Sequence, residues 1–487
     1  MLMLCTDMGT TMSKVQVFNE NGEIVFYDSK PTPLCEIDGE YYADIARIRS
    51  TVFELIRSAS KVGKISSVAF SSFGESFVLL DGNGELLTYP MLYTDTRGQA
   101  CAEAVSESIG IDTVFRLTGT VPHPMYSLYK ALWIKENQPG LFAKAEKLCL
   151  ICDYMGYLLT GRCVIDYSLA SRTGAFDIRR KEFSREILDR TGIPASLFSE
   201  PCPAGTVVGT VLPDVAASLG LPADCRLILG SHDQICATLG AGVLSDGEAA
   251  DGMGTVECIT AVFSNPESSA EFGKMGYCVV PFPGDLYCTY ILNFTCGSLV
   301  NWYRNEIVHG FTGEENSVFT YLERQKEPTD VLVLPYFAGC STPYQDGNAK
   351  GVIANLTTVT TDAQIYRAIL EGTSFEMKMN LEVVSEYGIH VRSVTATGGG
   401  ANSAAWLSLK SDIFGIPVRT LRSSEGGLCG LGILSATALG LAADTSAARN
   451  IFVQYDKTFS PSDRFEGEYG KNYLKYKKLY KLMKEVN

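Results

Sequence analysis

The sequence predicts an α/β protein that opens with a hairpin. Strand-like apolar stretches alternate with helical patterns along the chain, which is typical of this fold class. Residues 2–6 are apolar, a Gly-Thr-Thr turn follows at 9–11, and residues 14–18 alternate between polar and apolar before the turn Asn19-Glu-Asn-Gly22. We therefore expect two antiparallel strands at the start of a sheet.

The second half of the sequence repeats this opening. Residues 248–263 again read as a strand, a Gly-Thr turn and a strand, close to the middle of the chain. A pattern that returns in this way indicates two related units. We predict one lobe over residues 1–245 and a second lobe over residues 246–487.

Several further elements follow from local patterns. We expect helices over 45–59, 149–159 and 403–414, a strand over 67–70, and a basic surface helix over 471–484. A second hairpin is expected to join residues 77–80 to 85–87 across Asp81-Gly-Asn-Gly84.

The bulk composition disfavours several classes of partner. The 487 residues carry 55 acidic and 41 basic side chains, a net charge of −14, so neither nucleic acid nor an anionic membrane is expected as a main partner. The 15 scattered cysteines and the absence of a signal-peptide pattern favour a cytoplasmic protein. The uncharged run 426–443 holds five glycines and is predicted to be a buried helix rather than a membrane span.

Three glycine- and hydroxyl-rich turns follow predicted strands. They are Asp7-Met-Gly-Thr-Thr-Met-Ser-Lys14, Gly252-Met-Gly-Thr255 and Ala396-Thr-Gly-Gly-Gly-Ala-Asn402. Glycine lets the backbone approach a phosphate, the Thr hydroxyls can donate hydrogen bonds, and Lys14 adds a positive charge. Since neither GxxxxGK[ST] nor GxGxxG occurs, these turns favour a nucleotide held between two lobes over a P-loop or a dinucleotide fold.

The segment Leu229-Gly-Ser-His-Asp233 supplies a candidate general base. Asp233 follows a predicted strand and precedes a helix of small residues, where it could accept a proton from an attacking hydroxyl. The alternative is a structural N-cap. We interpret His232 as a local hydrogen-bonding residue.

Four segments together resemble the FGGY family of carbohydrate kinases, in the sugar kinase/actin/Hsp70 superfamily, and particularly its xylulokinase-like and gluconokinase-like members. The resemblance runs from the Asp7 turn to at least Leu441. The segments are Asp7-x-Gly-Thr-Thr-x-x-Lys14, Asp166-Tyr-Ser-x-Ala-Ser-x-Thr173, Gly230-x-His-Asp-Gln-x-x-Ala237, and Gly398-Gly-Gly-Ala-x-Ser-x-x-Trp406 continuing to Val418.

This resemblance implies two ribonuclease-H-like lobes of the actin-like ATPase type, which close on ATP and a sugar in a cleft between them. It implies that Asp233 is the catalytic base and that Asp7 and Asp233 lie near Mg²⁺. The residues implied along ATP are Thr10, Thr11, Lys14, Gly254, Thr255, Gly398, Gly399, Gly400 and Ser403.

The resemblance places the acceptor mainly on the first lobe. A carboxylate such as Glu75 can accept two hydroxyl hydrogens, and an aromatic ring such as Tyr93 can cover a C–H face. Asp95 could instead form an internal ion pair with Arg97. The implied acceptor residues are Gly74, Glu75, Tyr93, Asp95, Met125, Tyr126, Asp233 and Gln234.

Departures from subfamily patterns narrow the acceptor. Glycerol kinases carry Arg-Glu where this chain has Gly74-Glu75, and xylulokinases usually carry His where it has Glu75. Residues 119–125 are similar to gluconate kinases, but a gluconate carboxylate beside Glu75 would be repelled unless a cation intervened. We expect a neutral ketose (a pentulose or hexulose such as xylulose) or a polyol, with gluconate as the alternative.

A reading from another class is a non-catalytic, actin-like ATP-binding protein, which would keep the phosphate turns without needing Asp233. A dehydrogenase would need a dinucleotide fingerprint, which the sequence does not contain. Apart from its small-molecule substrate, the expected partner is a second copy of the chain, since dimers are the common default.

Overall fold

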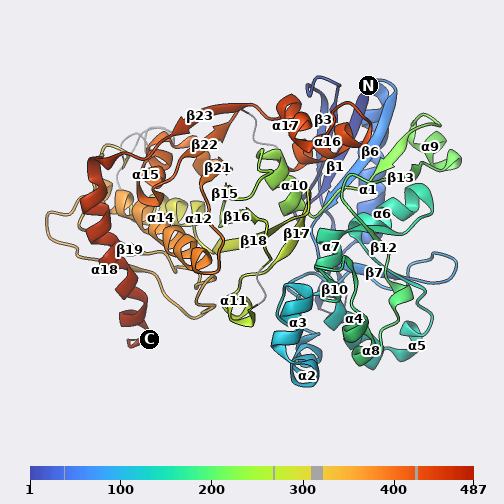
Figure 1. The fold of residues 1–487 in the computed structure, drawn as a ribbon, viewed down its shortest axis with the longest axis horizontal. Helices are drawn as coiled ribbons and strands as arrows, with labels where there is room; N and C mark the ends of the chain where they lie inside the picture. The colour runs from blue at the N-terminus through green and yellow to red at the C-terminus, as the bar shows by residue number, and fades with distance from the viewer. Residues whose placement is uncertain (38, 267–268, 309–321, 423–425, 487) are drawn as a thin grey trace.

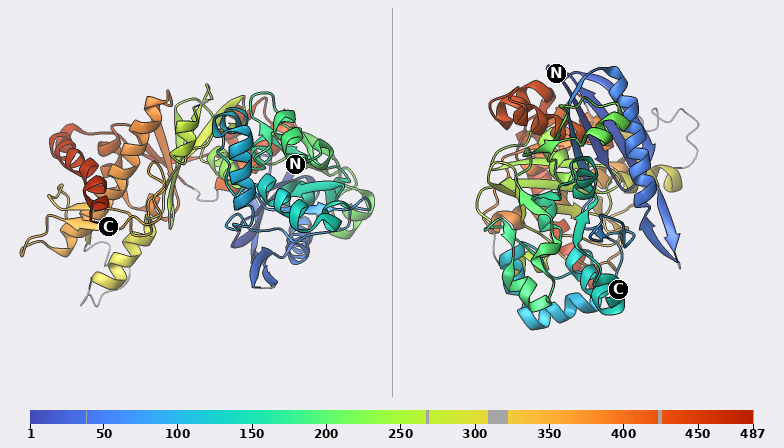
Figure 2. Two further views of the ribbon diagram at one scale, coloured as in Figure 1. Left: turned by 90° about the horizontal axis from the view of Figure 1, so that it is seen from below. Right: turned by 90° about the vertical axis from the view of Figure 1, so that its right-hand side faces the viewer.

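The computed structural model describes residues 1–37, 39–266, 269–308, 322–422 and 426–486. They form two lobes that lie side by side (Figure 1), one mainly from the blue and green half of the chain and one mainly from the yellow, orange and red half. Figure 2 shows the same two bodies from two further directions.

The first lobe is built on a mixed sheet in the order β13-β14-β6-β1-β2-β3. The predicted opening hairpin is present, and β6 and β14 extend it as parallel strands while β13 closes the edge antiparallel. The strands are β1 (Leu2–Met8), β2 (Met12–Phe18), β3 (Ile24–Pro31), β6 (Ile65–Ser72), β13 (Val207–Thr210) and β14 (Arg226–Ile228).

The second lobe repeats this topology around the order β17-β18-β16-β15-β21-β22-β23. Here β15, β16 and β18 form the antiparallel part, and β21 and β22 run parallel to β15, as β6 and β14 do to β1. This repeat confirms the prediction of two related α/β lobes. The strands are β15 (Glu248–Met253), β16 (Glu257–Phe263), β17 (Val280–Phe282), β18 (Leu286–Asn293), β21 (Ser393–Thr397), β22 (Val418–Leu421) and β23 (Tyr455–Phe459).

Two helices join the lobes. Helix α10 (Asp233–Gly240) ends shortly before β15, and α16 (Gly426–Ala438) comes from the later half of the sequence. In space, however, α16 and α17 (Thr445–Phe452) lie against the first sheet (Figure 1). There Leu431 shares a core with Met3 and Cys5. The 245/246 boundary stays a prediction about sequence segments, since α16 and α17 lie against the first lobe in space.

The longest helix of the second lobe is α14 (Asp362–Glu386), and it begins at a capping box. The Thr361 side chain accepts from the Gln364 amide, and the Gln364 side chain accepts from the Thr361 amide. The other helices that bear on the argument are α1 (Ile45–Ala59), α6 (Ile151–Thr160), α7 (Tyr167–Ser171), α12 (Gly297–Trp302), α15 (Ala404–Phe414) and α18 (Glu466–Lys484).

The other described strands form small two-stranded sheets, and further helices accompany them. The strands are β4 (Leu34–Ile37), β5 (Glu40–Ala43), β7 (Phe77–Leu80), β8 (Lys147–Leu150), β9 (Val164–Asp166), β10 (Phe176–Asp177), β11 (Glu182–Phe183), β12 (Glu200–Cys202), β19 (Leu332–Leu334) and β20 (Val352–Ala354). The helices are α2 (Gln99–Ile109), α3 (Ile111–Thr118), α4 (Ser127–Asn137), α5 (Pro139–Phe142), α8 (Arg185–Thr191), α9 (Pro213–Leu219) and α11 (Ala270–Lys274).

Two local predictions were wrong in part. The helix expected from residue 149 begins at Ile151, because Cys149 and Leu150 end the strand β8. An apolar run such as Cys-Leu-Ile-Cys fits a buried strand as well as a helix. The second hairpin forms only a short pairing, with a bridge between Leu80 and Leu86 and a hydrogen bond from the Leu87 amide to the Leu79 carbonyl at 2.8 Å, whereas β7 pairs along its whole length with β8.

The run 426–443 contains the buried helix that was predicted, α16. Within the described part of the chain, no helix has both the length and the apolar character that a membrane crossing requires. All 15 cysteines are unpaired thiols.

A buried carboxyl on α14 makes folding depend on pH. Glu376 accepts hydrogen bonds from Tyr336 Oη (2.9 Å) and from Tyr476 Oη, and burial raises its pKa from 4.5 to about 7. The folded state therefore binds this proton more tightly than the unfolded state. The associated stability is present at low pH and is lost as the pH rises through about 7.

We predict that Glu376→Gln makes thermal stability less sensitive to pH. Between about pH 5 and about pH 8, the melting temperature should fall less than in the wild type, because the amide does not ionise. Glu386→Gln, at an exposed position of the same helix, is the matched control and should keep the wild-type dependence. An unchanged pH dependence in Glu376→Gln would show that this carboxyl does not titrate in this range.

Candidate active site

The candidate base lies where β14 leads into α10. Gly230 passes so close to the neighbouring strand that a Cβ there would stand 1.8 Å from the Phe70 carbonyl oxygen, so only glycine fits. Asp233 is the first residue of α10, and its Oδ1 accepts from the Gln234 amide at 2.6 Å. The predicted strand–Asp–helix arrangement is therefore present.

Asp233 shares its surroundings with other carboxylates. Its side chain keeps 30% of its surface exposed, yet the dense protein around it and the charge of Asp7 raise its pKa to about 8, with Glu75 contributing in the same direction. Arg172 acts in the opposite direction. Like charges held together in this way are typical of functional sites.

His232 links Asp233 to the second lobe. Its Nε2 lies 3.2 Å from Asp233 Oδ1, and its Nδ1 lies 3.2 Å from Tyr290 Oη on β18. Burial lowers the pKa of His232 well below its usual value, with Arg172 adding to the effect, so the imidazole is neutral at pH 7. This is the hydrogen-bonding role expected from the sequence; the contact with Tyr290 was not foreseen.

The first of the predicted phosphate-binding turns joins β1 to β2. The Gly9 amide donates to the Met12 carbonyl at 3.0 Å, which closes the turn and leaves Thr10 and Thr11 exposed at its tip. Asp7 and Lys14 stand opposite each other across the hairpin. Ser71 Oγ, at the end of the parallel strand β6, donates to Asp7 Oδ1 at 2.6 Å.

The second and third turns lie together in the second lobe. Gly254 and Thr255 are exposed between β15 and β16. A Cβ at Gly398 would stand 2.8 Å from the Met253 carbonyl oxygen, so the glycine-rich loop passes directly beside this turn. The turn also rests on the start of α12, where the Gly297 amide donates to the Gly254 carbonyl at 2.9 Å.

Glu75 is held by a buried arginine that the sequence did not single out. Arg172 Nε donates to Glu75 Oε1 at 2.5 Å, both side chains are 6% exposed, and the guanidinium lies 5.0 Å from the centre of the Tyr126 ring. A Cβ at Gly74 would stand 3.0 Å from Cγ of Arg172. Glu75 itself has a φ of +63°, a strained value for a non-glycine residue that is found most often at functional sites.

Three further charged side chains at this end of the first lobe, Arg97, Asp95 and Lys130, also have hydrogen-bond partners. Arg97 donates from Nε to both oxygens of Asp95 at 3.0 Å, which is the internal ion pair considered from the sequence. Lys130 Nζ donates to the carbonyls of Leu92 (2.7 Å) and Met125 (2.9 Å), and burial lowers the pKa of this lysine to about 8.

Comparison with known proteins matches residues 2–240 to the N-terminal domain, and residues 277–439 to the C-terminal domain, of the FGGY family of carbohydrate kinases. The chain belongs to this family. The resemblance inferred from the four motifs is confirmed, and the chain is a sugar kinase for which the family implies ATP as the phosphoryl donor.

Individual relatives cover nearly the whole kinase. The xylulose kinase of Bacillus subtilis (strain 168) is 27% identical over 492 residues, which covers 99% of this chain and 97% of that protein. The gluconokinase of the same strain is 28% identical over 471 residues, covering 90% and 88%. The solved structure of a gluconate kinase from Lactobacillus acidophilus superposes with a TM-score of 0.89 at 26% identity, covering 99% and 98%.

A buried ion cluster lies in the second lobe, next to two of the predicted ATP-binding segments. The ammonium of Lys410 on α15 contacts Asp251 on β15 and Glu257 on β16, and all three side chains are fully buried. Burial raises the pKa of Glu257. Since Asp251 and Glu257 flank the Gly254 turn and α15 follows the glycine-rich loop, Lys410 ties two of the predicted ATP-binding segments together.

The remaining predicted residues differ in how they are placed. Tyr93 is 43% exposed, and Gln234 is also exposed. Ser403 caps α15 by accepting from the Trp406 amide, and its hydroxyl donates to Glu323 at 2.7 Å. Their contacts with ATP or sugar stay predictions.

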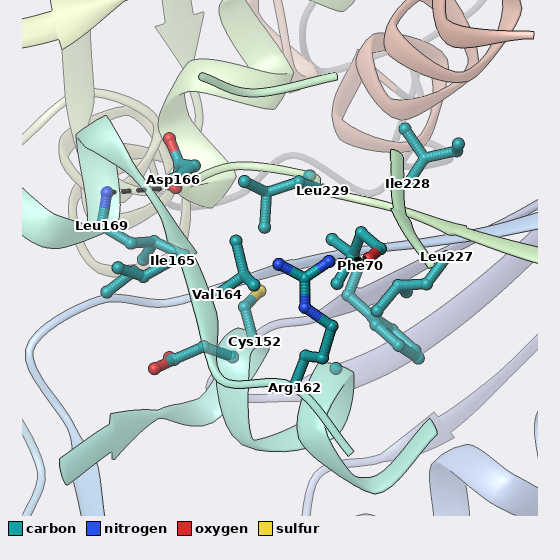
Figure 3. Close-up of a pocket in the computed structure, with 14 residues that line it drawn as sticks. Phe70, Cys152, Arg162, Val164, Ile165, Asp166, Leu169, Leu227, Ile228 and Leu229 are labelled. Carbon is teal, nitrogen blue, oxygen red and sulfur yellow. Dashed lines mark hydrogen bonds between the residues drawn. The ribbon is translucent and has the colours of Figure 1, made fainter. Parts of the chain in front are cut away.

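A small void of about 10 Å³ in the first lobe is too small for a sugar or a nucleotide (Figure 3). It is lined by side chains that include Cys152, Arg162 and Asp166, and Leu229 lies beside it. Within the described chain, no group of three or more His, Cys, Asp or Glu side chains is placed to hold a metal ion.

We predict that Lys410→Met destabilises the kinase, because it leaves two carboxylates buried without their counter-ion. Removing one partner of a buried ion pair costs about 3–5 kcal/mol. Urea unfolding should show this loss, and the affinity for ADP should fall as well. The triple variant Asp251→Asn/Glu257→Gln/Lys410→Met, which removes all the charges, should regain part of the stability. If Lys410→Met has the same free energy of unfolding in urea as the wild type, Lys410 does not stabilise the fold as proposed.

Proposed function

We propose that this kinase transfers the γ-phosphoryl group of ATP to a hydroxyl of a neutral ketose or polyol, with Asp233 as the general base. The observation that carries the proposal is the position of Asp233 at the start of α10, beside His232 and within the electrostatic reach of Asp7 and Glu75. Its raised pKa supports a role in proton transfer.

In the proposed step, the acceptor hydroxyl gives its proton to the Asp233 carboxylate as its oxygen forms a bond to the γ-phosphorus. The bond from this phosphorus to the β–γ bridging oxygen breaks, and ADP leaves with that electron pair. The exposed turns at Thr10–Thr11 and Gly254–Thr255 would donate to the phosphate oxygens. Closure of the two lobes would keep water from competing with the sugar.

The residues present fit a magnesium ion. Asp7 and Asp233 are carboxylates whose mutual repulsion contributes to the raised pKa of Asp233, and hard cations prefer such oxygen ligands. When bound, Mg²⁺ would neutralise phosphate charge and favour the ionised form of Asp233. Asp7 and Asp233 are the residues proposed to hold it.

A neutral acceptor is supported by how the charges of the first lobe are paired. Arg172 is neutralised by Glu75, Arg97 by Asp95, and Lys130 is bound to two carbonyls. An acceptor carboxylate would therefore meet arginines whose charge is already paired, although Nη1 of Arg172 is buried without a hydrogen-bond partner. The free hydrogen-bonding capacity of the Glu75 carboxylate suits sugar hydroxyls. The homodimer and the cytoplasmic location stay predictions.

The proposal is tested by measuring ADP release with Mg²⁺-ATP against D-xylulose, other ketoses, polyols, glycerol and gluconate. We predict that a neutral ketose or polyol stands well above the background ATPase rate. Asp233→Asn should keep ATP binding and lower kcat by at least about 10²-fold. Gluconate as the best acceptor would refute the neutral-acceptor claim. If no acceptor raises ADP release above background although the protein binds ATP, a non-catalytic ATP-binding protein would be favoured.

We predict that Glu75→Gln acts mainly on the acceptor. The amide keeps the shape but loses one acceptor oxygen and the charge that pairs with Arg172, so KM for the sugar should rise while KM for ATP changes little. Steady-state kinetics with each substrate varied in turn measures both values. If only KM for ATP changed, Glu75 would not be an acceptor-binding residue, and the prediction would be wrong.

A further inference from the structure

Apart from Arg172, which pairs with Glu75, the family motif at residues 166–173 has no role in the proposed mechanism. Asp166 is 2% exposed and caps α7. Its Oδ2 accepts from the Ser168 amide at 2.9 Å, and its Oδ1 accepts from the Leu169 amide at 3.2 Å. These bonds alone would make it an ordinary N-cap.

The same carboxylate also reaches the loop that carries the candidate base. Ser231 Oγ donates to Asp166 Oδ2 at 2.8 Å, across 65 positions of sequence. The hydroxyls of Ser168 and Ser231 are 2.7 Å apart, and the His232 amide donates to Ser168 Oγ at 3.1 Å. Thus both residues that directly precede Asp233 are bound to α7.

The direction of each hydrogen bond in this group follows from the donors available. Asp166 accepts the proton of Ser231, so the Ser168 hydroxyl donates to Ser231 Oγ while its own oxygen accepts from the His232 amide. Ser231 is fully buried and Ser168 is 1% exposed. In a buried network whose members are all satisfied, the geometry is strongly specified.

The loop also borders the small void in Figure 3, which is lined by Asp166 together with Leu229 and Gly230. The hydrogen bond from Ser231 is what connects the loop to Asp166 here. On its other side the loop is tied to β6 by a parallel bridge between Ser72 and His232.

We infer that Asp166, Ser168 and Ser231 form a hydrogen-bonded brace that positions the Asp233 carboxylate for proton transfer. They are positioning residues, since they act on the substrate only through Asp233. The inference rests on the proposed function, in which Asp233 is the base. A small misplacement of a reacting group can cost up to about 10²-fold in rate, so the brace should be visible in kcat.

The test compares Ser168→Ala and Ser231→Ala with a matched control, Ser171→Ala. Ser171 is also fully buried on α7, but its hydroxyl donates only to the Ser168 carbonyl, at 2.7 Å within the helix. With the fastest acceptor of the panel, we expect each of the first two variants to lose about 10-fold in kcat with KM for ATP unchanged, and the control to stay near the wild type.

A second arm uses the Asp233→Asn background. If the brace acts through Asp233, adding Ser168→Ala or Ser231→Ala there should lower the residual rate no further. Wild-type kcat in both single variants, a loss equal to that of Ser171→Ala, or the same loss in the Asp233→Asn background would overturn the inference. Near-normal turnover of Asp233→Asn alone would instead overturn the proposed function. The two failures are therefore distinguishable.

Discussion

The close crossing of α10 and α16 is the constraint on which the rest of the structure depends. A Cβ at Gly240 would stand 1.8 Å from the Gly426 carbonyl oxygen, and a Cβ at Gly430 would stand 2.0 Å from the Cys236 carbonyl oxygen. The two helix backbones therefore meet without side chains between them. Because α10 begins at Asp233 and α16 comes from the second half of the sequence, this contact fixes the candidate base relative to both halves of the chain. The repeated sheet order supplies the two lobes, and the crossing joins them.

At the predicted acceptor end of the site, two arginines of the first lobe are paired with carboxylates of the same lobe. Arg172 is paired with Glu75 and Arg97 with Asp95, whereas burial and the charge of Asp7 raise the pKa of Asp233. A metal cation with a phosphate chain would suit Asp7 and Asp233. Uncharged hydroxyls would suit the residues of the two ion pairs, such as Glu75. Under the proposed function, recognition of a neutral sugar and activation of its hydroxyl would both fall to residues of the first lobe.

Much of this could be predicted from the sequence because its signals are local. The hairpin turns at Asp7 and Gly254, and the strand–Asp–helix segment at Asp233, each lie within a few consecutive residues. The missed features depend on distant contacts: Arg172 meets Glu75 across 97 positions, and Lys410 meets Asp251 across 159. The packing of α16 on the first sheet was missed for the same reason. Periodicity also failed at Cys149, where a buried strand and a helix share one apolar pattern.

The most direct test of the central claim, that Asp233 is the general base, is chemical rescue of Asp233→Ala. With Asp233 replaced by Ala, the space of the lost carboxylate can admit formate, which can accept the proton in its place. We predict that formate raises the rate of ADP release by Asp233→Ala in proportion to its concentration, and that it has no such effect on Asp7→Ala. Turnover of Asp233→Ala at the wild-type rate without formate would contradict the assignment.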